Sequence, residues 1–246
     1  MNVNQLLSAA KNNDLLANFK LGKYYEENNY LVNAAINSVY FYERSAVLGH
    51  ADGMYKVASL YEHGYGVRKD INRAIYYYEC AARLNHSKAT TRLGNIYEMG
   101  LGVNPNPQKA LNYYQNGCAL KDASAMYNLG LCYKNGSLDK KDETKAFEFL
   151  SSAAKLNFYL AYIEVAKAKE YGIGTTVDFE ESFKYYVLSA NIGNVDAMVS
   201  AGRIALNVFH NLIEAKKWFI KASSLNNLEA KEMLKELFKK YPFLFG

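Results

Sequence analysis

The sequence predicts an all-α protein built as a solenoid of stacked helix pairs. Three observations predict it: a motif that recurs every 36 residues, apolar positions spaced for one helical face within each motif, and only three prolines in 246 residues. So few prolines leave long helices almost uninterrupted. A pair of helices cannot bury its apolar face alone, so repeats of this kind must stack on one another.

The period is visible when each repeat is counted from a small residue as position zero. Leucine or valine then stands at position four, glycine or alanine at position five, and tyrosine at position eight of the first four repeats. These positions share one face of a helix, with small residues where a second helix must come close. Position five of the fourth repeat is Gly130, which we expect to face a neighbouring helix. Position zero is occupied by Ala17, Gly53, Ala89, Ala125, Ala161, Ala197 and, after a shorter step, Ala230.

Each repeat contains two predicted helices. The first ends at glycines, which supply a left-handed cap without a Cβ penalty; these are Gly64, Gly66, Gly100, Gly102, Gly136, Gly172 and Gly174. The second begins at a residue that caps helix N-termini well; these residues are Asp70, Asn106, Asp142, Asp178 and Asn211.

Both chain ends fit the same scheme. Residues 3–12 are predicted to be the second helix of an incomplete repeat, and residues 229–240 a closing helix. We therefore expect one solenoid domain over residues 1–246, with an N-terminal capping helix in 1–16, six repeats in 17–229 and a C-terminal helix and tail in 230–246. The loops of the first and sixth repeats lack the glycine pattern and are expected to differ in shape.

Composition and charge limit the function classes. Half of the residues are hydrophobic and 22% are charged, as in ordinary soluble globular proteins. The formal net charge of +5 is modest for this length, and nucleic-acid binders usually cluster basic residues on one face. We expect no nucleic-acid partner.

The start of the chain and its cysteines indicate a compartment. Residues 1–7 carry neither a basic opening nor an apolar run, so they do not resemble a secretory signal. No window approaches the roughly 18 apolar residues that span a bilayer. Cys80, Cys118 and Cys132 lie on apolar helical faces, as small buried hydrophobes of a reducing compartment do. We expect a cytoplasmic protein, with secretion by a signal-less route left open.

At this point the residues carry a family resemblance. The string from Gly64 to Asp70, followed by Ala74, Tyr77-Tyr78 and Ala81-Ala82, resembles the Sel1-like repeat, and the resemblance covers residues 17–233. It implies a right-handed α/α superhelical solenoid of about six 36-residue helix-pair repeats, related to tetratricopeptide repeats, that acts as an adaptor or scaffold.

A second, more distant resemblance concerns one cysteine. Residues 117–122 are similar to the cysteine-rich bacterial branch of that family, in which a second cysteine follows Cys118 eight residues later. That position here is Met126, so the disulfide of the branch is not carried over.

Catalytic and cofactor chemistry find little support in the sequence. The glycine pairs follow helices, whereas a dinucleotide loop follows a strand. His50 and His86 are 36 residues apart, and equivalent side chains in neighbouring helix pairs lie roughly 10 Å apart, too far for one metal ion. Neither Cys118 nor Cys132 has the signature of an activated nucleophile. We expect no enzyme, no cofactor and no metal site.

The resemblance places the first helix of each repeat on a concave surface, where positions two, six and nine would face a partner. We call the residues that share one such position in successive repeats a column. Column two is apolar, and it either packs against the neighbouring repeat or forms part of a protein-binding groove. The predicted partner-binding residues are Phe19, Lys23, Glu26, Tyr55, Glu62, Glu98, Tyr127, Leu131, Ile163, Lys167, Glu170 and Arg203.

The predicted function is that of a scaffold or adaptor that binds a protein or peptide. Three alternatives stay open at this stage. A toxin-neutralising, immunity-type protein or a secreted effector would have the same fold and a different partner. An enzyme would need a pocket with convergent polar groups, and a nucleic-acid binder would need clustered positive charge.

Overall fold

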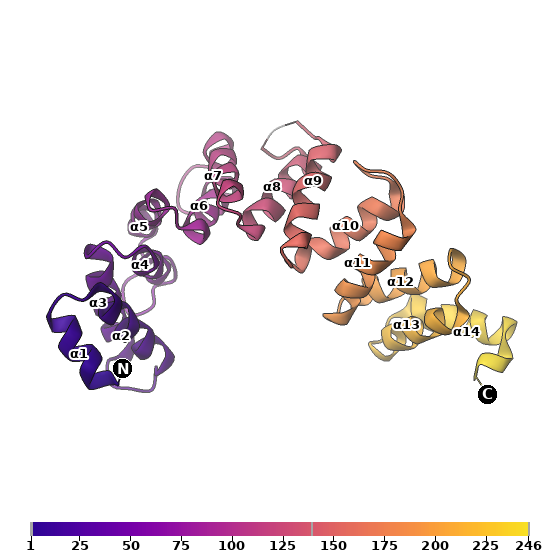
Figure 1. The fold of residues 1–246 in the computed structure, drawn as a ribbon, viewed down its shortest axis with the longest axis horizontal. Helices are drawn as coiled ribbons and strands as arrows, with labels where there is room; N and C mark the ends of the chain where they lie inside the picture. Colours follow the sequence, from indigo (N-terminus) through magenta and orange to yellow (C-terminus); the bar gives the residue numbers. More distant parts are fainter. Residues whose placement is uncertain (1, 139, 246) are drawn as a thin grey trace. The chain divides into compact units, whose positions relative to one another are not determined.

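The structure of the protein, a computed structural model, describes residues 2–138 and 140–245. Within them the chain forms fourteen α-helices and one short 3-10 helix, η1, and no strand (Figure 1). The α-helices are α1 Val3–Lys11, α2 Leu15–Glu27, α3 Ala34–Val47, α4 Ala51–His63, α5 Ile71–Arg83, α6 Ser87–Met99, α7 Pro107–Ala119, α8 Ala123–Asn135, α9 Glu143–Lys155, α10 Leu160–Tyr171, α11 Phe179–Asn191, α12 Val195–Asn207, α13 Leu212–Ser224 and α14 Leu228–Lys240, and η1 is Pro242–Phe245.

The helices form two compact halves, Met1–Ala125 and Met126–Gly246. In the N-terminal half the pairs α2–α3, α4–α5 and α6–α7 pack together, and each pair packs on the next. In the C-terminal half α10–α11 and α12–α13 pair in the same way, and α14 packs on α13. The predicted all-α class with helix-pair repeats is confirmed. The single domain over residues 1–246 stays a prediction.

The core is built from the positions that the period selects. Leu21, Val57, Leu93 and Val165 at position four have no exposed surface, and Leu129 has almost none. Position zero is equally buried in every repeat. The face predicted from the sequence is therefore the face that packs.

Glycine at position five allows a large side chain of the second helix to lie directly on the first. A Cβ placed on Gly94 would lie 2.5 Å from the ring of Tyr114, too close for any real contact. The same test on Gly130 gives 2.8 Å to Leu150 Cγ, which confirms the expected close approach. A side chain at Gly94 would overpack the repeat, and a side chain at Gly130 would have to displace that of Leu150.

The five predicted N-caps of the second helices are confirmed. Each side-chain oxygen accepts a hydrogen bond from the backbone N–H three residues later, at 2.9–3.0 Å; the caps are Asp70, Asn106, Asp142, Asp178 and Asn211. First helices are capped too, and here His50 and His86 act as caps. Their Nδ1 atoms accept from the N–H groups of Gly53 and Ala89 at 3.1 Å.

The loops that were expected to differ do so. Glycine-containing loops use positive φ at their glycines, as at Gly64 and Gly66 (75° and 70°). In the first repeat α2 ends without a left-handed residue, and Asn33 (φ 57°) stands before α3 instead. In the sixth repeat His210 (φ 52°) takes the left-handed position. Helices α1 and α14 lie where the two end helices were predicted.

Candidate binding surface

The predicted partner-binding residues lie on the first helices α2, α4, α6, α8, α10 and α12. Column two is only partly exposed. Phe19, Tyr55, Tyr127 and Ile163 are half-buried, whereas Thr91 and Val199 in the same column are buried. In the C-terminal half Tyr127 and Ile163 pack against the core, together with Leu131 of column six.

Each aromatic ring of column two contacts the ring that lies three residues before position zero of the next repeat. The Phe19 ring lies 4.7 Å from that of His50, and the Tyr55 ring stacks on His86 at the same distance. Tyr127 meets Phe158 at 5.2 Å. One face of each ring thus packs within the solenoid, and the exposed remainder is open to a partner.

A hollow of about 390 Å³ in the N-terminal half is shared by Phe19 and Tyr55. Polar groups complete its wall. Because His86 Nδ1 accepts a backbone N–H, the ring proton lies on Nε2, which donates to Asp52 at 3.0 Å. Lys56 also lines the hollow. Two aromatic anchors with charged neighbours are typical of a protein-binding surface.

Column nine is occupied by bonds within the chain. Glu26 accepts a hydrogen bond from the Tyr42 hydroxyl at 2.6 Å, and Glu62 accepts one from Tyr78 at 2.8 Å. The same bond joins Tyr114 to Glu98 and Tyr186 to Glu170. Burial, and then the bonded carboxylate, raise the pKa of Tyr42, Tyr78 and Tyr186 far above the usual range.

A basic residue at position three of the next repeat completes the arrangement in the N-terminal half. Lys56 Nζ lies 2.8 Å from Glu26, and Arg92 pairs with Glu62, whose side chain is only 7% exposed. Burial raises the pKa of Glu62, but the hydrogen bonds from Arg92 and Tyr78 outweigh burial and hold this pKa below its ordinary value. The Glu62 carboxylate is therefore engaged in contacts within the solenoid.

In the C-terminal half the fourth repeat reverses this arrangement. Position nine is Lys134, whose Nζ lies 2.6 Å from Glu164 at position three of the next repeat. The phenol is absent, because position 25 is Leu150. The fifth repeat returns to glutamate: Glu170 holds Tyr186, and Arg203 of column six approaches it at 3.8 Å.

Column six supplies the most exposed charges. Lys23 pairs loosely with Glu27 of its own helix at 3.5 Å, with both side chains more than half exposed. Lys167 is exposed and has no ion-pair partner within 4 Å among the described residues. Of the predicted residues, Phe19 and Tyr55 share one hollow, and Glu170 and Arg203 form one pair. Partner contact at all twelve positions stays a prediction.

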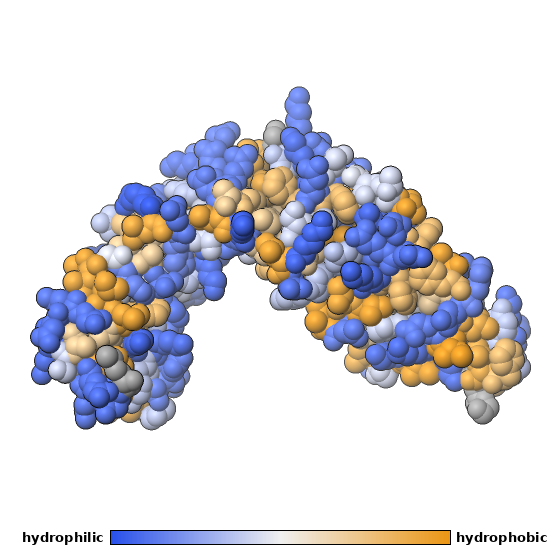
Figure 2. All heavy atoms as spheres, viewed as in Figure 1, coloured by the Kyte–Doolittle hydropathy of each residue, from blue (hydrophilic) through white to orange (hydrophobic). Residues whose placement is uncertain are grey.

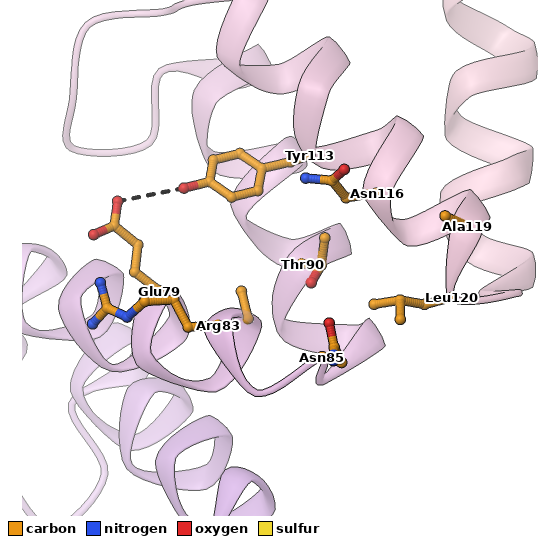
Figure 3. Close-up of a pocket in the computed structure, with 9 residues that line it drawn as sticks. Glu79, Arg83, Asn85, Thr90, Tyr113, Asn116, Ala119 and Leu120 are labelled. Atoms are coloured by element: carbon orange, nitrogen blue, oxygen red, sulfur yellow. Dashed lines mark hydrogen bonds between the residues drawn. The ribbon is translucent and has the colours of Figure 1, made fainter.

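A second, larger hollow lies in the N-terminal half, away from the predicted columns. It has a volume of about 580 Å³ between α5, α6 and α7, and Glu79, Arg83, Thr90, Tyr113 and Asn116 line it (Figure 3). Figure 3 shows the Tyr113 hydroxyl turned to Glu79, at 3.5 Å. Burial, and then the Glu79 charge, raise the pKa of Tyr113 to about 12.

One residue that lines this hollow is smaller than its counterparts in most other repeats. Position one is Thr90 in the third repeat, whereas the second, fifth and sixth repeats carry Met54, Tyr162 and Met198 there. The sequence alone already held this signal, since position one could be compared between repeats.

Cysteine and metal chemistry have no assembled site in the described ranges. Cys80, Cys118 and Cys132 are not joined in disulfides, and burial raises the pKa of Cys118 to about 12, which opposes thiolate formation. Across residues 2–138 and 140–245, no three His, Cys, Asp or Glu side chains converge as metal ligands would.

The outer surface is mixed in character. Figure 2 shows hydrophobic and hydrophilic groups interspersed on the visible face of each half. Within the part of the chain that the structure describes, no helix has both the length and the apolar composition needed to cross a membrane.

A family model, the Sel1 repeat, matches well over half of the chain. The matched ranges are 51–86, 87–122, 123–158, 160–194 and 202–227, so all but the last two residues of the first predicted repeat lie outside them. No curated protein matches the chain.

Among solved structures, a Sel1 repeat protein from Oxalobacter formigenes is similar over 91% of this chain and 98% of its own, at 27% identity and a TM-score of 0.76. The c5321 protective antigen of uropathogenic Escherichia coli, which displays an SLR fold, matches 98% of this chain at 20% identity and a TM-score of 0.79. The chain spans 60% of the length of that protein.

Proposed function

Since the chain belongs to the Sel1 repeat family, we propose that it is an interaction scaffold that binds a protein or peptide on the face built by its first helices. The observation that carries the proposal is the pair of half-exposed rings, Phe19 and Tyr55, around one hollow. Rings fixed on one side and accessible on the other contribute contact area at little entropic cost.

Binding is favoured over catalysis by the state of the acidic groups. Glu26, Glu62 and Glu170 of column nine are each held by a tyrosine hydroxyl and a cation. A general base needs a carboxylate that is free to meet substrate. Three cysteines outside any disulfide support a reducing, cytoplasmic location as part of the same proposal.

The test is affinity capture from native lysate with mass spectrometry, followed by titration of the captured partner with variants. We expect Tyr55→Ala to weaken binding about thirtyfold or more, the usual effect of removing a hot-spot aromatic. The matched control is Tyr76→Ala, since Tyr76 is an exposed tyrosine on the second helix α5.

Both variants are to be titrated well below their melting temperatures, because Tyr55 also stacks on His86. If Tyr55→Ala lowers only the melting temperature and binds as the parent does, column two serves packing alone. The proposed binding face is then wrong.

A further inference from the structure

The C-terminal half contains a mostly apolar pocket of about 390 Å³ that none of the comparisons assigns. It lies between the end of α8, the first turns of α9 and the end of α10. Its apolar wall is formed by Ala146, Phe147, Leu150, Ala168, Tyr171 and Ile173.

Two residues that line this pocket are smaller than their counterparts in other repeats. Position 25 is aromatic in the other five repeats, as Tyr42, Tyr78, Tyr114, Tyr186 and the aligned Phe219. In those with a tyrosine, the ring reaches position nine. In the fourth repeat Leu150 stops short, and Lys134 at position nine lines the resulting space.

Position seven makes the second contribution. The fifth repeat carries Ala168 there, whereas the third and sixth carry Ile96 and Ile204, which are buried. Departures from a repeat that open a cavity lose packing energy in the free protein. Places where a sequence breaks its own pattern at a cost are often functional.

Charged side chains form the rim of the pocket, and not all of them have an ion-pair partner. Lys134 holds Glu164 at 2.6 Å, and Lys141 holds Glu143 at 2.8 Å. Lys167 is exposed at the rim with no ion-pair partner within 4 Å in the described part of the chain. The charge left unmatched at this pocket is therefore positive.

We propose that this pocket receives a large apolar side chain from a segment of a partner protein, and that a carboxylate next to that side chain pairs with Lys167. The proposal rests on the proposed binding function and specifies the chemistry of the partner. The volume is at the lower end of the range for ligand pockets, which suits one side chain better than a whole cofactor. Lys134 and Lys167 belong to the predicted columns, so the pocket adjoins the first-helix face.

The experiment uses a displayed library of short random peptides, selected on the immobilised full chain and counter-selected on Leu150→Phe. A phenylalanine is expected to fit, because Gly130 already provides the space that Gly202 gives Phe219. Leu160→Phe, at an exposed leucine outside the pocket, is the matched control. A second filling variant, Ala168→Ile, carries the residue that the third and sixth repeats use, and circular dichroism melts check the folding of each variant.

Enriched peptides are expected to combine Leu, Ile, Met or Phe with a neighbouring Asp or Glu. By fluorescence anisotropy, one such peptide should bind either filling variant at least about tenfold more weakly than the parent, and bind Leu160→Phe unchanged. Lys167→Gln should weaken it about twofold to fivefold, as an exposed ion pair allows. Lys155→Gln, at an exposed lysine outside the pocket, should have no effect.

The charge contribution is isolated by replacing the acidic residue of the peptide with its amide, which should abolish the effect of Lys167→Gln. Peptides that bind both filling variants as well as the parent, or that lack an acidic residue, would overturn the proposal. Its failure is distinct from that of the proposed function, which is tested in the N-terminal half with a natural partner.

Discussion

The second and fourth repeats carry opposite charges at position nine, and each charge is paired in a different way. In the second, Glu62 at position nine is buried, accepts the Tyr78 hydroxyl and pairs with Arg92 of the next repeat. In the fourth, Lys134 is 43% exposed and pairs with Glu164. The first site is a closed network, and the second is an open pair beside a pocket.

The difference teaches how the three positions depend on one another. Where position nine is a glutamate, position 25 is a tyrosine that donates to it; where position nine is a lysine, position 25 is a leucine and position three of the next repeat becomes acidic. A tyrosine hydroxyl beside a lysine would lose its carboxylate acceptor. The substitutions are therefore one coordinated change.

Removal of the acidic group from the closed network is expected to have the largest effect. Glu62→Ala leaves the Arg92 guanidinium and the buried Tyr78 hydroxyl without their acceptor, at a cost of about 3 kcal/mol. Lys134→Ala, the matched variant of the open pair, should cost less than about 1 kcal/mol. Urea unfolding of both variants measures the difference, and equal losses would contradict the contrast drawn here.

Acid should weaken the same network. Because the pKa of Glu62 is lowered in the folded chain, the unfolded chain takes up this proton first, at about pH 4.3. The stabilisation is present above that pH and is lost as the pH falls through the folded pKa. Urea midpoints measured at about pH 7 and about pH 3 should fall more in the parent than in Glu62→Gln. A parallel fall in the two proteins would show that Glu62 does not contribute.

Alanine in place of glycine at position five tests whether the side chain that faces it on the second helix can move aside. Gly94→Ala forces a Cβ onto the Tyr114 ring and should cost about 1–2 kcal/mol, even after the gain in helix propensity. Gly130→Ala meets Leu150, which has the adjoining pocket to move into, and should be nearly neutral. Thermal melts of the two variants check this. An equal loss would mean that the pocket gives Leu150 no freedom.

Reversal of the charges of Lys134 and Glu164 should show directly whether these two side chains interact. Lys134→Glu places two carboxylates together and should cost about 1 kcal/mol, whereas Lys134→Glu with Glu164→Lys should recover the parent stability within about 0.5 kcal/mol. A double-mutant cycle in urea measures the coupling. If the double variant is no more stable than the single one, the two side chains do not interact in solution.

Filling the polar hollow should have the smallest effect. Thr90→Met introduces the residue that Met54 and Met198 place at position one, and it should raise the stability by about 0.5–1 kcal/mol. The Thr90 hydroxyl bond to the His86 carbonyl is lost, which limits the gain. A lower melting temperature for Thr90→Met would mean that the hollow is closed or filled in solution.

Much of the fold could be predicted from the sequence because the responsible interactions are local. Caps such as Asp70 act within three residues, and the buried positions follow from the period of a single helix. His50 and His86 were harder to interpret. A histidine at a helix start is an uncommon cap, and only the backbone geometry shows that Nδ1 is the acceptor.

The candidate site was less predictable, because periodicity identifies a face and not the partner across it. Column nine reads as exposed charge until Tyr78, 16 residues away, and Arg92, 30 residues away, are brought to Glu62. Lys169 shows the same limit. It stands at position eight, where the first four repeats carry tyrosine, and its Nζ lies 2.8 Å from Glu181. Comparison of several positions between repeats would have revealed both exchanges.

The ion pairs between position nine of one repeat and position three of the following repeat have a consequence for deletions of whole repeats. Deletion of residues 53–88 would bring Glu26 opposite Arg92, a combination the chain already uses at Glu62. Deletion of residues 125–160 would instead bring Glu98 opposite Glu164, two carboxylates with no cation between them. Loss of a repeat should therefore be tolerated at the first joint and opposed at the second, and we expect the fourth and fifth repeats to be retained together.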